Sequence, residues 1–147
     1  MNRKNIVVAI TGASGAAYAK RLLECLVAAQ AEIHLVVSPN GQRLLADELG
    51  IKRSDAEVLV GNEHAALVTV HAYRDVGAAI ASGSFLTDGM VICPCSSKTL
   101  GEVASGTGSN LITRAAAVHL KEARRLVLVH REMPVSQIDL ENMLRIA

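Results

Sequence analysis

The sequence has very few aromatic residues: Tyr18, Tyr73 and Phe85 are the only three, and tryptophan is absent. Proteins that bind single-stranded nucleic acid stack bases on aromatic side chains, so this function is not expected. Neither sign of charge predominates: 15 basic and 14 acidic residues leave a net charge of +1, and the sequence has no block of like charge. This balance gives no bulk attraction to nucleic acid or to anionic lipid.

Cysteines and long apolar runs are scarce as well. Three cysteines, an odd number, argue against a disulfide framework. Cys93 and Cys95 have C-x-C spacing without a second pair of ligands, so we expect buried structural thiols and no metal site. The five histidines show no ligand spacing, and surface or capping roles are expected for each. The apolar run 6–10 is too short for a signal sequence or a membrane span, which predicts a cytoplasmic protein.

Half of the 147 residues are hydrophobic, which is enough for the core of one domain. The chain is too short for two domains, so we expect a single domain over residues 1–147. Apolar runs predict strands at 5–10, 32–38, 88–93 and 126–130. Apolar residues at helical spacing predict helices at 15–29, 42–49, 98–104, 110–121 and 138–145. Residues 50–84 have a weaker pattern, which we interpret as one strand-like piece and a helix near 74–81.

Strands that alternate with helices predict an α/β fold: a doubly wound parallel sheet of the flavodoxin or Rossmann type, with helices on both faces. Ligands of such sheets bind beyond the carboxyl ends of the strands. The segments that follow the four predicted strands are polar or rich in glycine: Gly12 to Gly15, Ser38, Pro94 to Thr99, and Arg131 with Glu132. We therefore expect the functional site at this edge.

The segment Gly12-Ala13-Ser14-Gly15 has two interpretations. Small residues before a helix let backbone N–H groups approach an anion, but the segment could also be an ordinary tight turn with Ser14 as the helix cap. Neither a nucleotide-triphosphate loop nor a full G-x-G-x-x-G is present, and Ser38 stands where dinucleotide-binding proteins have an acidic residue. These absences favour flavin mononucleotide (FMN) over a dinucleotide.

Cations and hydroxyls near the other strand ends suggest a second phosphate. Ser96, Ser97, Lys98 and Thr99 precede a predicted helix, and capping accounts for only one of their hydroxyls. Arg114 and Lys121 lie about 10 Å apart on one face of another predicted helix. On their own these two would be read as part of a solvated helix face, but with Arg131 they suggest a phosphorylated substrate.

Several motifs in the right order resemble the flavin prenyltransferases, UbiX-like flavoproteins once named aromatic-acid or polyprenyl-hydroxybenzoate decarboxylase subunits. The matching segments cover nearly the whole chain: Ile10 to Leu23, Ile80 to Phe85, Pro94 to Leu100, Leu111 to Ala116, and Leu120 to Met143 with gaps. The resemblance implies that a dimethylallyl group moves from dimethylallyl phosphate to reduced FMN without metal. The product, prenylated FMN, serves a partner decarboxylase.

The resemblance also implies roles for individual residues. FMN contacts fall on Gly12, Ala13, Ser14, Ser38, Ser96, Ser97, Lys98, Thr99 and Arg131. The resemblance implies that Arg114, Lys121 and Arg131 bind the prenyl phosphate. Glu132 would assist proton transfer, with Ser14 near the reactive flavin nitrogen. A homo-oligomer is implied, based on trimers and extending to a dodecamer, with sites shared between subunits.

The sequence departs from the family pattern in three places. Ser97 replaces a residue that is often apolar, Met133 replaces a usual threonine, and the pattern continues for several tens of residues beyond Ala147 to a tyrosine and a basic residue that grip the prenyl phosphate. Two alternatives follow: a non-catalytic FMN carrier subunit of a decarboxylase system, or a flavin-dependent cysteine-type decarboxylase. The P-x-M-N-x-x-M-W motif of those decarboxylases is absent.

Overall fold

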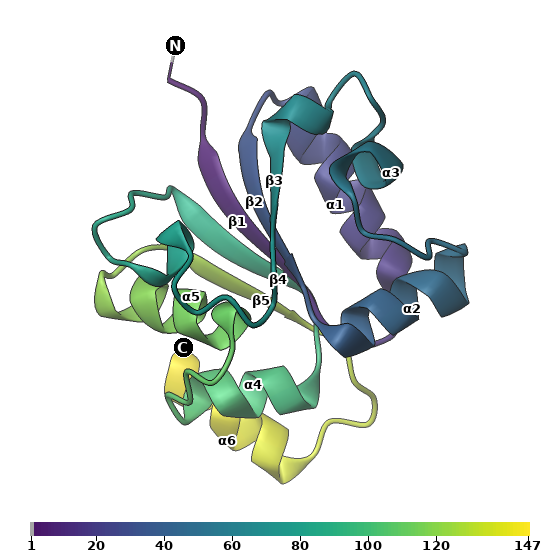
Figure 1. Ribbon diagram of the computed structural model, residues 1–147. Helices are drawn as coiled ribbons and strands as arrows, with labels where there is room; N and C mark the ends of the chain where they lie inside the picture. The colour runs from purple at the N-terminus through teal and green to yellow at the C-terminus, as the bar shows by residue number, and fades with distance from the viewer. Residues whose placement is uncertain (1) are drawn as a thin grey trace.

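The computed structural model describes residues 2–147 as a parallel sheet of five strands between two layers of helices (Figure 1). The strands are β1 (Asn5–Ile10), β2 (Glu32–Val37), β3 (Val68–His71), β4 (Gly89–Cys95) and β5 (Leu126–His130). Their order is β3-β2-β1-β4-β5, so the chain changes its direction of winding between β1 and β4. The predicted doubly wound α/β fold is confirmed.

One face of the sheet is covered by α1 (Ala16–Ala28), α2 (Pro39–Leu49) and α3 (Ala56–Val60). Successive strand residues point to opposite faces, and Val8 and Ile10 of β1 pack on this side with Leu23 of α1 and Leu45 of α2. All four side chains are fully buried. This packing fixes the starts of α1 and α2 beside the carboxyl ends of β1 and β2.

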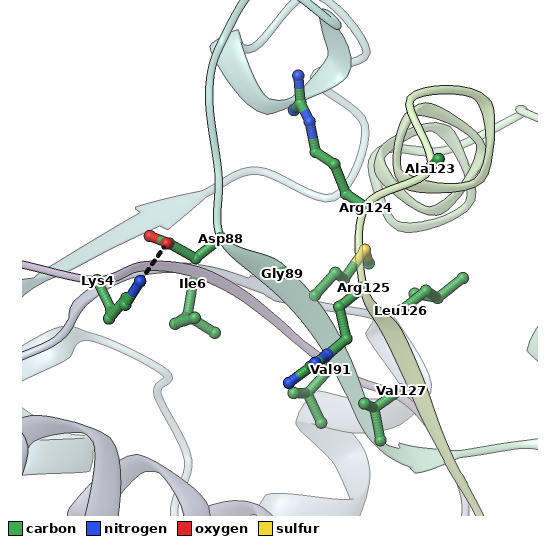
Figure 2. Close-up of a pocket in the computed structure, with 11 residues that line it drawn as sticks. Lys4, Ile6, Asp88, Gly89, Val91, Ala123, Arg124, Arg125, Leu126 and Val127 are labelled. Carbon is green, nitrogen blue, oxygen red and sulfur yellow. Dashed lines mark hydrogen bonds and ion pairs between the residues drawn. The ribbon is translucent and has the colours of Figure 1, made fainter.

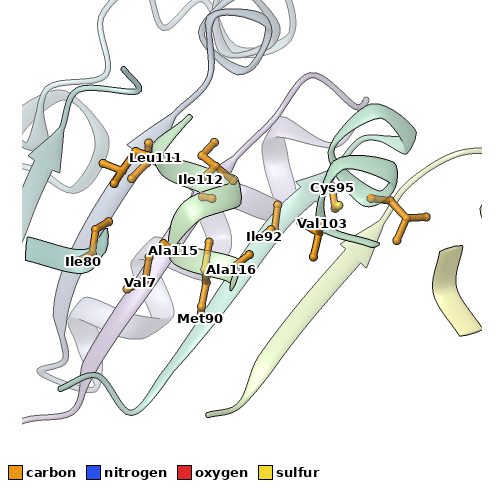
Figure 3. Packing of buried hydrophobic residues seen from close by; sticks show 13 residues of the cluster. Val7, Ile80, Met90, Ile92, Cys95, Val103, Leu111, Ile112, Ala115 and Ala116 are labelled. Carbon is orange, nitrogen blue, oxygen red and sulfur yellow. The ribbon is translucent and has the colours of Figure 1, made fainter. Parts of the chain in front are cut away.

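The opposite face carries α4 (Ser97–Ala104) and α5 (Leu111–Lys121), while α6 (Gln137–Ile146) packs against α4. Figure 3 shows Val7, Met90 and Ile92 of the sheet in contact with Ala115 and Ala116 of α5. Alanines on α5 bring its backbone close to the sheet. Because β4 ends at Cys95 and α4 begins at Ser97, the first turn of α4 lies at the carboxyl edge of the sheet.

The prediction for residues 50–84 is partly wrong. The strand-like piece is β3, but 74–81 forms turns with only a short 3-10 helix, η2 (Ala79–Ala81); α3 and a second 3-10 helix, η1 (Ala65–Leu67), were not predicted. The Asp75 carboxylate accepts a hydrogen bond from the Gly77 backbone N–H at 3.2 Å, a local bond that competes with helix formation. No helix within residues 2–147 is long and apolar enough to cross a membrane.

Candidate functional site

The exits of β1 and β4 are joined by Thr11 at the point where the winding changes direction. Its hydroxyl donates to the Pro94 carbonyl at 2.7 Å and accepts from the Ser96 backbone N–H at 2.9 Å. The Thr11 backbone N–H also donates to the Pro94 carbonyl at 3.2 Å. Thr11 is buried, so these bonds are shielded from water and hold the two exits in one arrangement.

Two helices begin at this edge with their N-termini directed at the same cavity. Ser38 caps α2 by accepting from the Gly41 N–H at 2.9 Å, and Ser96 caps α4 by accepting from the Thr99 N–H at 3.2 Å. The cavity between them has a volume of about 260 Å³. Its lining consists of Thr11, Gly12, Ser38, Pro39, Asn40, Tyr73, Ser96, Lys98 and Thr99. Helix N-termini, hydroxyls and a lysine are the groups that bind a phosphate.

Glycine is required at two places beside this cavity because the chain segments approach closely. A Cβ on Gly12 would lie 2.5 Å from the Asn40 Cβ, and a Cβ on Gly41 would overlap the Ile10 carbonyl oxygen. The loop after β1 can therefore lie against the first turn of α2. The fit with a phosphate ligand rests on this exposed backbone together with the two helix starts.

Ser14 does not cap α1, because Gly15 occupies that position without a side-chain bond. The Ser14 hydroxyl instead donates to Glu48 Oε1 at 2.8 Å, while Oε2 accepts from the backbone N–H groups of Gly15 at 3.2 Å and Ala16 at 2.8 Å. These bonds lower the pKa of Glu48, the Ala16 N–H having the largest effect, and the charge of Arg131 adds to it. A carboxylate of the protein itself thus occupies the anion-binding start of α1.

Glu48 is a site residue that sequence reasoning missed, as are Asn40 and Tyr73 in the cavity lining. Glu48 lies on α2, 32 residues from the backbone N–H group of Ala16 that it accepts from, and an isolated glutamate on a helix carries no signal of such a bond. Asn40 follows the strand exit at Ser38 and could have been included on that ground.

Of the remaining residues predicted to contact the flavin, some line this cavity and others do not. Lys98 lines the cavity and forms an ion pair with Glu102 at 2.8 Å, which raises the pKa of Lys98. Ala13, Ser14, Ser97 and Arg131 do not line it. The Ser97 hydroxyl lies 2.9 Å from His130 Nε2. The predicted roles of these residues toward a ligand remain predictions.

Arg114 and Lys121 share one face of α5, as predicted, but they line a second cavity of about 360 Å³. This cavity has no lining residue in common with the first. Its other walls are glycines and apolar residues, among them Gly106, Gly108 and Ala117. Arg131 and Glu132 are exposed after β5, with the Arg131 backbone N–H bonded to the Cys95 carbonyl at 3.2 Å. One copy of the chain therefore keeps its predicted phosphate-binding cations apart.

The thiols follow the prediction, and two of the five histidines do not. Cys93 and Cys95 are buried and free, and burial raises the pKa of Cys95 to about 12, so it remains a neutral thiol. His119 is buried, bonded to the Ala115 carbonyl at 2.7 Å and to the Thr87 hydroxyl at 2.8 Å. The side chain of His130 is also buried, with 7% of it exposed. Surface or capping roles are therefore wrong for these two histidines, which satisfy polar groups inside the fold.

A larger cavity, of about 850 Å³, lies at the opposite edge, against the amino ends of β1, β4 and β5. Figure 2 shows its wall, where Lys4 and Asp88 face each other at 2.8 Å. The Asp88 carboxylate also accepts from the Asn5 backbone N–H at 2.8 Å, so its charge is already satisfied. No helix start contributes to its lining among the described residues, so this open hollow is a weaker candidate than the smaller cavity at the carboxyl edge.

Comparison with known proteins identifies the family of the chain. The family model described as "Flavoprotein" matches residues 1–147. A probable UbiX-like flavin prenyltransferase of Bacillus subtilis is 47% identical over 139 residues, which is 95% of this chain and 65% of that protein. This chain thus spans about two thirds of that relative's length.

Two solved structures are similar throughout the chain. The crystal structure of AnUbiX (PadA1) in complex with FMN and dimethylallyl pyrophosphate has a TM-score of 0.89 and 43% identity, covering 99% of this chain and 73% of that one. A dodecameric FMN-dependent UbiX-like decarboxylase from Escherichia coli O157:H7 has a TM-score of 0.85 and 44% identity, covering 96% and 74%. The chain belongs to the flavoprotein family, among the UbiX-like flavin prenyltransferases.

Proposed function

We propose that this protein transfers a dimethylallyl group from dimethylallyl phosphate to reduced FMN, and that the prenylated FMN serves a partner decarboxylase. The observation that carries the proposal is the cavity where the starts of α2 and α4 converge with Lys98 at the winding change of the sheet. A relative of 43% identity holds FMN and dimethylallyl pyrophosphate.

The FMN phosphate is assigned to the cavity at the carboxyl edge. Ser38, Ser96 and Thr99 present hydroxyls there, and Lys98 supplies a positive charge. Gly12 allows the flavin to approach the backbone after β1. Reduced FMN supplies the nucleophilic ring to which the dimethylallyl group is joined.

The phosphate of the prenyl donor is assigned to Arg114, Lys121 and Arg131. Fixed cations stabilise the charge that develops on a departing phosphate. A guanidinium can donate two parallel hydrogen bonds to phosphate oxygens, which also sets the orientation of the donor.

Proton transfer is assigned to Glu132 and to the pair formed by Ser14 and Glu48. The Ser14 hydroxyl donates to Glu48 Oε1, so its oxygen is oriented to accept a proton while the carboxylate can receive the hydroxyl proton. Glu132 follows Arg131 directly and is exposed, so it is accessible to a substrate that Arg131 holds.

The active unit is proposed to be a homo-oligomer built from trimers. The cavity of about 260 Å³ is smaller than the roughly 300–1,000 Å³ of most small-molecule sites, so one copy encloses only part of the ligands. Arg114 and Lys121 lie in a separate cavity, and a neighbouring copy could bring them to the flavin. A relative of 44% identity is dodecameric.

The separation of the two cavities also supports a second function, an FMN carrier without transfer activity. A chain that never brings Arg114 and Lys121 to a bound flavin would hold FMN without activating a prenyl donor. Both functions share the FMN site and differ in what happens to the donor.

The experiment that separates them is anaerobic incubation of the reduced, FMN-loaded protein with dimethylallyl phosphate, followed by mass spectrometry of the released flavin. Transfer adds one five-carbon unit, and unchanged FMN indicates the carrier. Glu132→Gln should retain FMN and form adduct at least tenfold more slowly. Glu57→Gln, an exposed change on α3, is the matched control. Normal transfer by Glu132→Gln would remove the role given to Glu132.

A cytoplasmic location is part of the proposal. It is supported by the cysteines, since Cys25, Cys93 and Cys95 are free thiols. Fractionation of the native host, with immunodetection of the protein, tests it; recovery from an extracytoplasmic fraction would contradict it.

A further inference from the structure

A largely buried polar cluster, formed by Ser97, His130 and Asp139, lies next to the proposed site. Ser97 is the first residue of α4, His130 the last residue of β5 and Asp139 the third residue of α6. The Ser97 hydroxyl is 2.9 Å from His130 Nε2, and Asp139 Oδ1 is 3.8 Å from the same nitrogen. Only 7% of the His130 side chain and 9% of the Asp139 side chain are exposed.

Asp139 is held in this cluster by further bonds. Its Oδ2 accepts from the Ser136 backbone N–H at 3.2 Å and from the Ser136 hydroxyl at 2.9 Å, which completes a capping box at the start of α6. The pKa of Asp139 is lowered, chiefly by the Ser97 hydroxyl and then by Ser136, with a smaller effect of His130. The carboxylate is therefore ionised at neutral pH. It lies where the start of α4, the end of β5 and the start of α6 meet.

The geometry is not that of a nucleophilic triad. In such a triad the carboxylate and the hydroxyl bond to opposite nitrogens of the imidazole, whereas here both lie beside Nε2. The Ser97 hydroxyl is also held behind the cavity and does not line it. The cluster is built to hold segments together.

The segment that it holds is the loop 131–136, which carries Arg131 and Glu132. The loop begins directly after His130 and ends at Ser136, the residue bonded to Asp139. Residues 131–134 are exposed, and the loop has few other bonds; the Arg131 N–H to Cys95 carbonyl bond at 3.2 Å is one of them. Both ends of the loop are thus anchored in one cluster, which Ser97 connects to the start of α4.

We propose that His130, through Ser97 and Asp139, is a positioning residue that sets the loop carrying Arg131 and Glu132 relative to the flavin-phosphate cavity. The inference rests on the proposed function. Ser96 and Lys98 flank Ser97 and line that cavity, so displacement of the cluster moves the loop against the bound flavin. Small misplacements of catalytic groups lower the rate of the chemical step more than they weaken ligand binding.

The test compares His130→Leu, which removes the bond to Ser97, with His130→Gln, whose amide can replace Nε2. His130→Leu is expected to lower the kcat of prenyl transfer about tenfold or more with FMN affinity within about twofold of the wild type. His130→Gln should recover most of the kcat. His64→Gln, a change at a histidine far along the chain from the cluster, is the control. Unchanged kcat in His130→Leu, or an equal loss in both His130 variants, overturns the proposal.

Amide hydrogen exchange of residues 131–136 gives a readout that does not depend on transfer. Exchange at Arg131 and Ser136 should accelerate in His130→Leu and return toward the wild-type rate in His130→Gln. If the wild-type protein binds FMN but forms no adduct, the proposed transfer activity is refuted. Whether His130 anchors the loop would then be tested by the exchange rates alone. Exchange that is identical in all variants overturns the anchoring whatever the activity.

Discussion

The position of a single carboxylate, that of Glu48, organises the start of α1. It accepts hydrogen bonds from the Ser14 hydroxyl and from two backbone N–H groups that have no partner within the helix. Because a helix start carries partial positive charge, the ionised form of Glu48 stabilises the folded state.

Stability should therefore depend on pH through Glu48. The pKa of this carboxyl is lowered on folding from its ordinary value of 4.5, so its contribution is present above that value and is lost as the pH falls through the lowered pKa. Glu48→Gln should be less stable than the wild type at pH 7 by about 1 kcal/mol or less. Urea unfolding at pH 7 and pH 3.5 should show this difference shrinking at the lower pH.

The matched control for this prediction is Glu57→Gln, which should change stability little at either pH. A difference between Glu48→Gln and the wild type that is the same at both pH values would mean that the charge of Glu48 does not stabilise α1.

At the scale of elements, α2 can begin at Pro39 only because its third residue is glycine. A Cβ on Gly41 would meet the Ile10 carbonyl oxygen, a backbone atom at the buried end of β1. Gly101 in α4 is the opposite case, since the nearest atom to its Cβ would be Asn142 Nδ2 at 3.5 Å, an ordinary contact. Glycine is thus required by close packing at position 41 and is not required by packing at position 101.

The same substitution should have opposite effects at these two positions. Gly41→Ala should lower the free energy of unfolding by about 1–3 kcal/mol through overpacking. Gly101→Ala should raise it by about 0.5–1 kcal/mol, because alanine has the higher helix propensity. Urea unfolding of both variants measures the difference; a stable Gly41→Ala protein would contradict the close approach of α2 to β1.

Elements with strong apolar patterns could be predicted from the sequence, and those fixed by side-chain bonds could not. The strand at 126–130 was predicted with its observed bounds, because four apolar residues follow two arginines and end at His130. The helix predicted near 74–81 is wrong because the bond of Asp75 to Gly77 is invisible in a hydrophobic pattern.

The candidate site shows the same division. Gly12, Ser38, Ser96, Lys98 and Thr99 were predicted and line one cavity, since parallel strands end at a common edge. Glu48 and the cluster around His130 join residues distant in the sequence, and only the folded chain reveals them.

At the scale of the whole molecule, the two separate cavities predict that neighbouring copies share a site. Lys98→Ala impairs the flavin cavity and Arg114→Ala the second cavity, so each variant alone should transfer the prenyl group poorly. Co-assembly of equal amounts should restore roughly a quarter of wild-type activity, because a quarter of the sites combine an intact Lys98 with an intact Arg114 from a neighbour.

The measurement is adduct formation per chain in co-purified mixed oligomers. Variants mixed after assembly, without subunit exchange, are the control and should stay inactive. Mixed oligomers that remain as inactive as the separate variants would show that the two cavities of different copies do not form one site.

The most direct test of the account is a fluorescence titration of the purified protein with FMN. The convergence of α2 and α4 on one phosphate predicts saturable binding of one FMN per chain, weakened at least tenfold by Lys98→Ala. Lys20→Ala, an exposed change on α1, should leave the affinity unchanged. Wild-type protein that does not bind FMN, or Lys98→Ala protein that binds it as tightly as the wild type, would contradict the central claim.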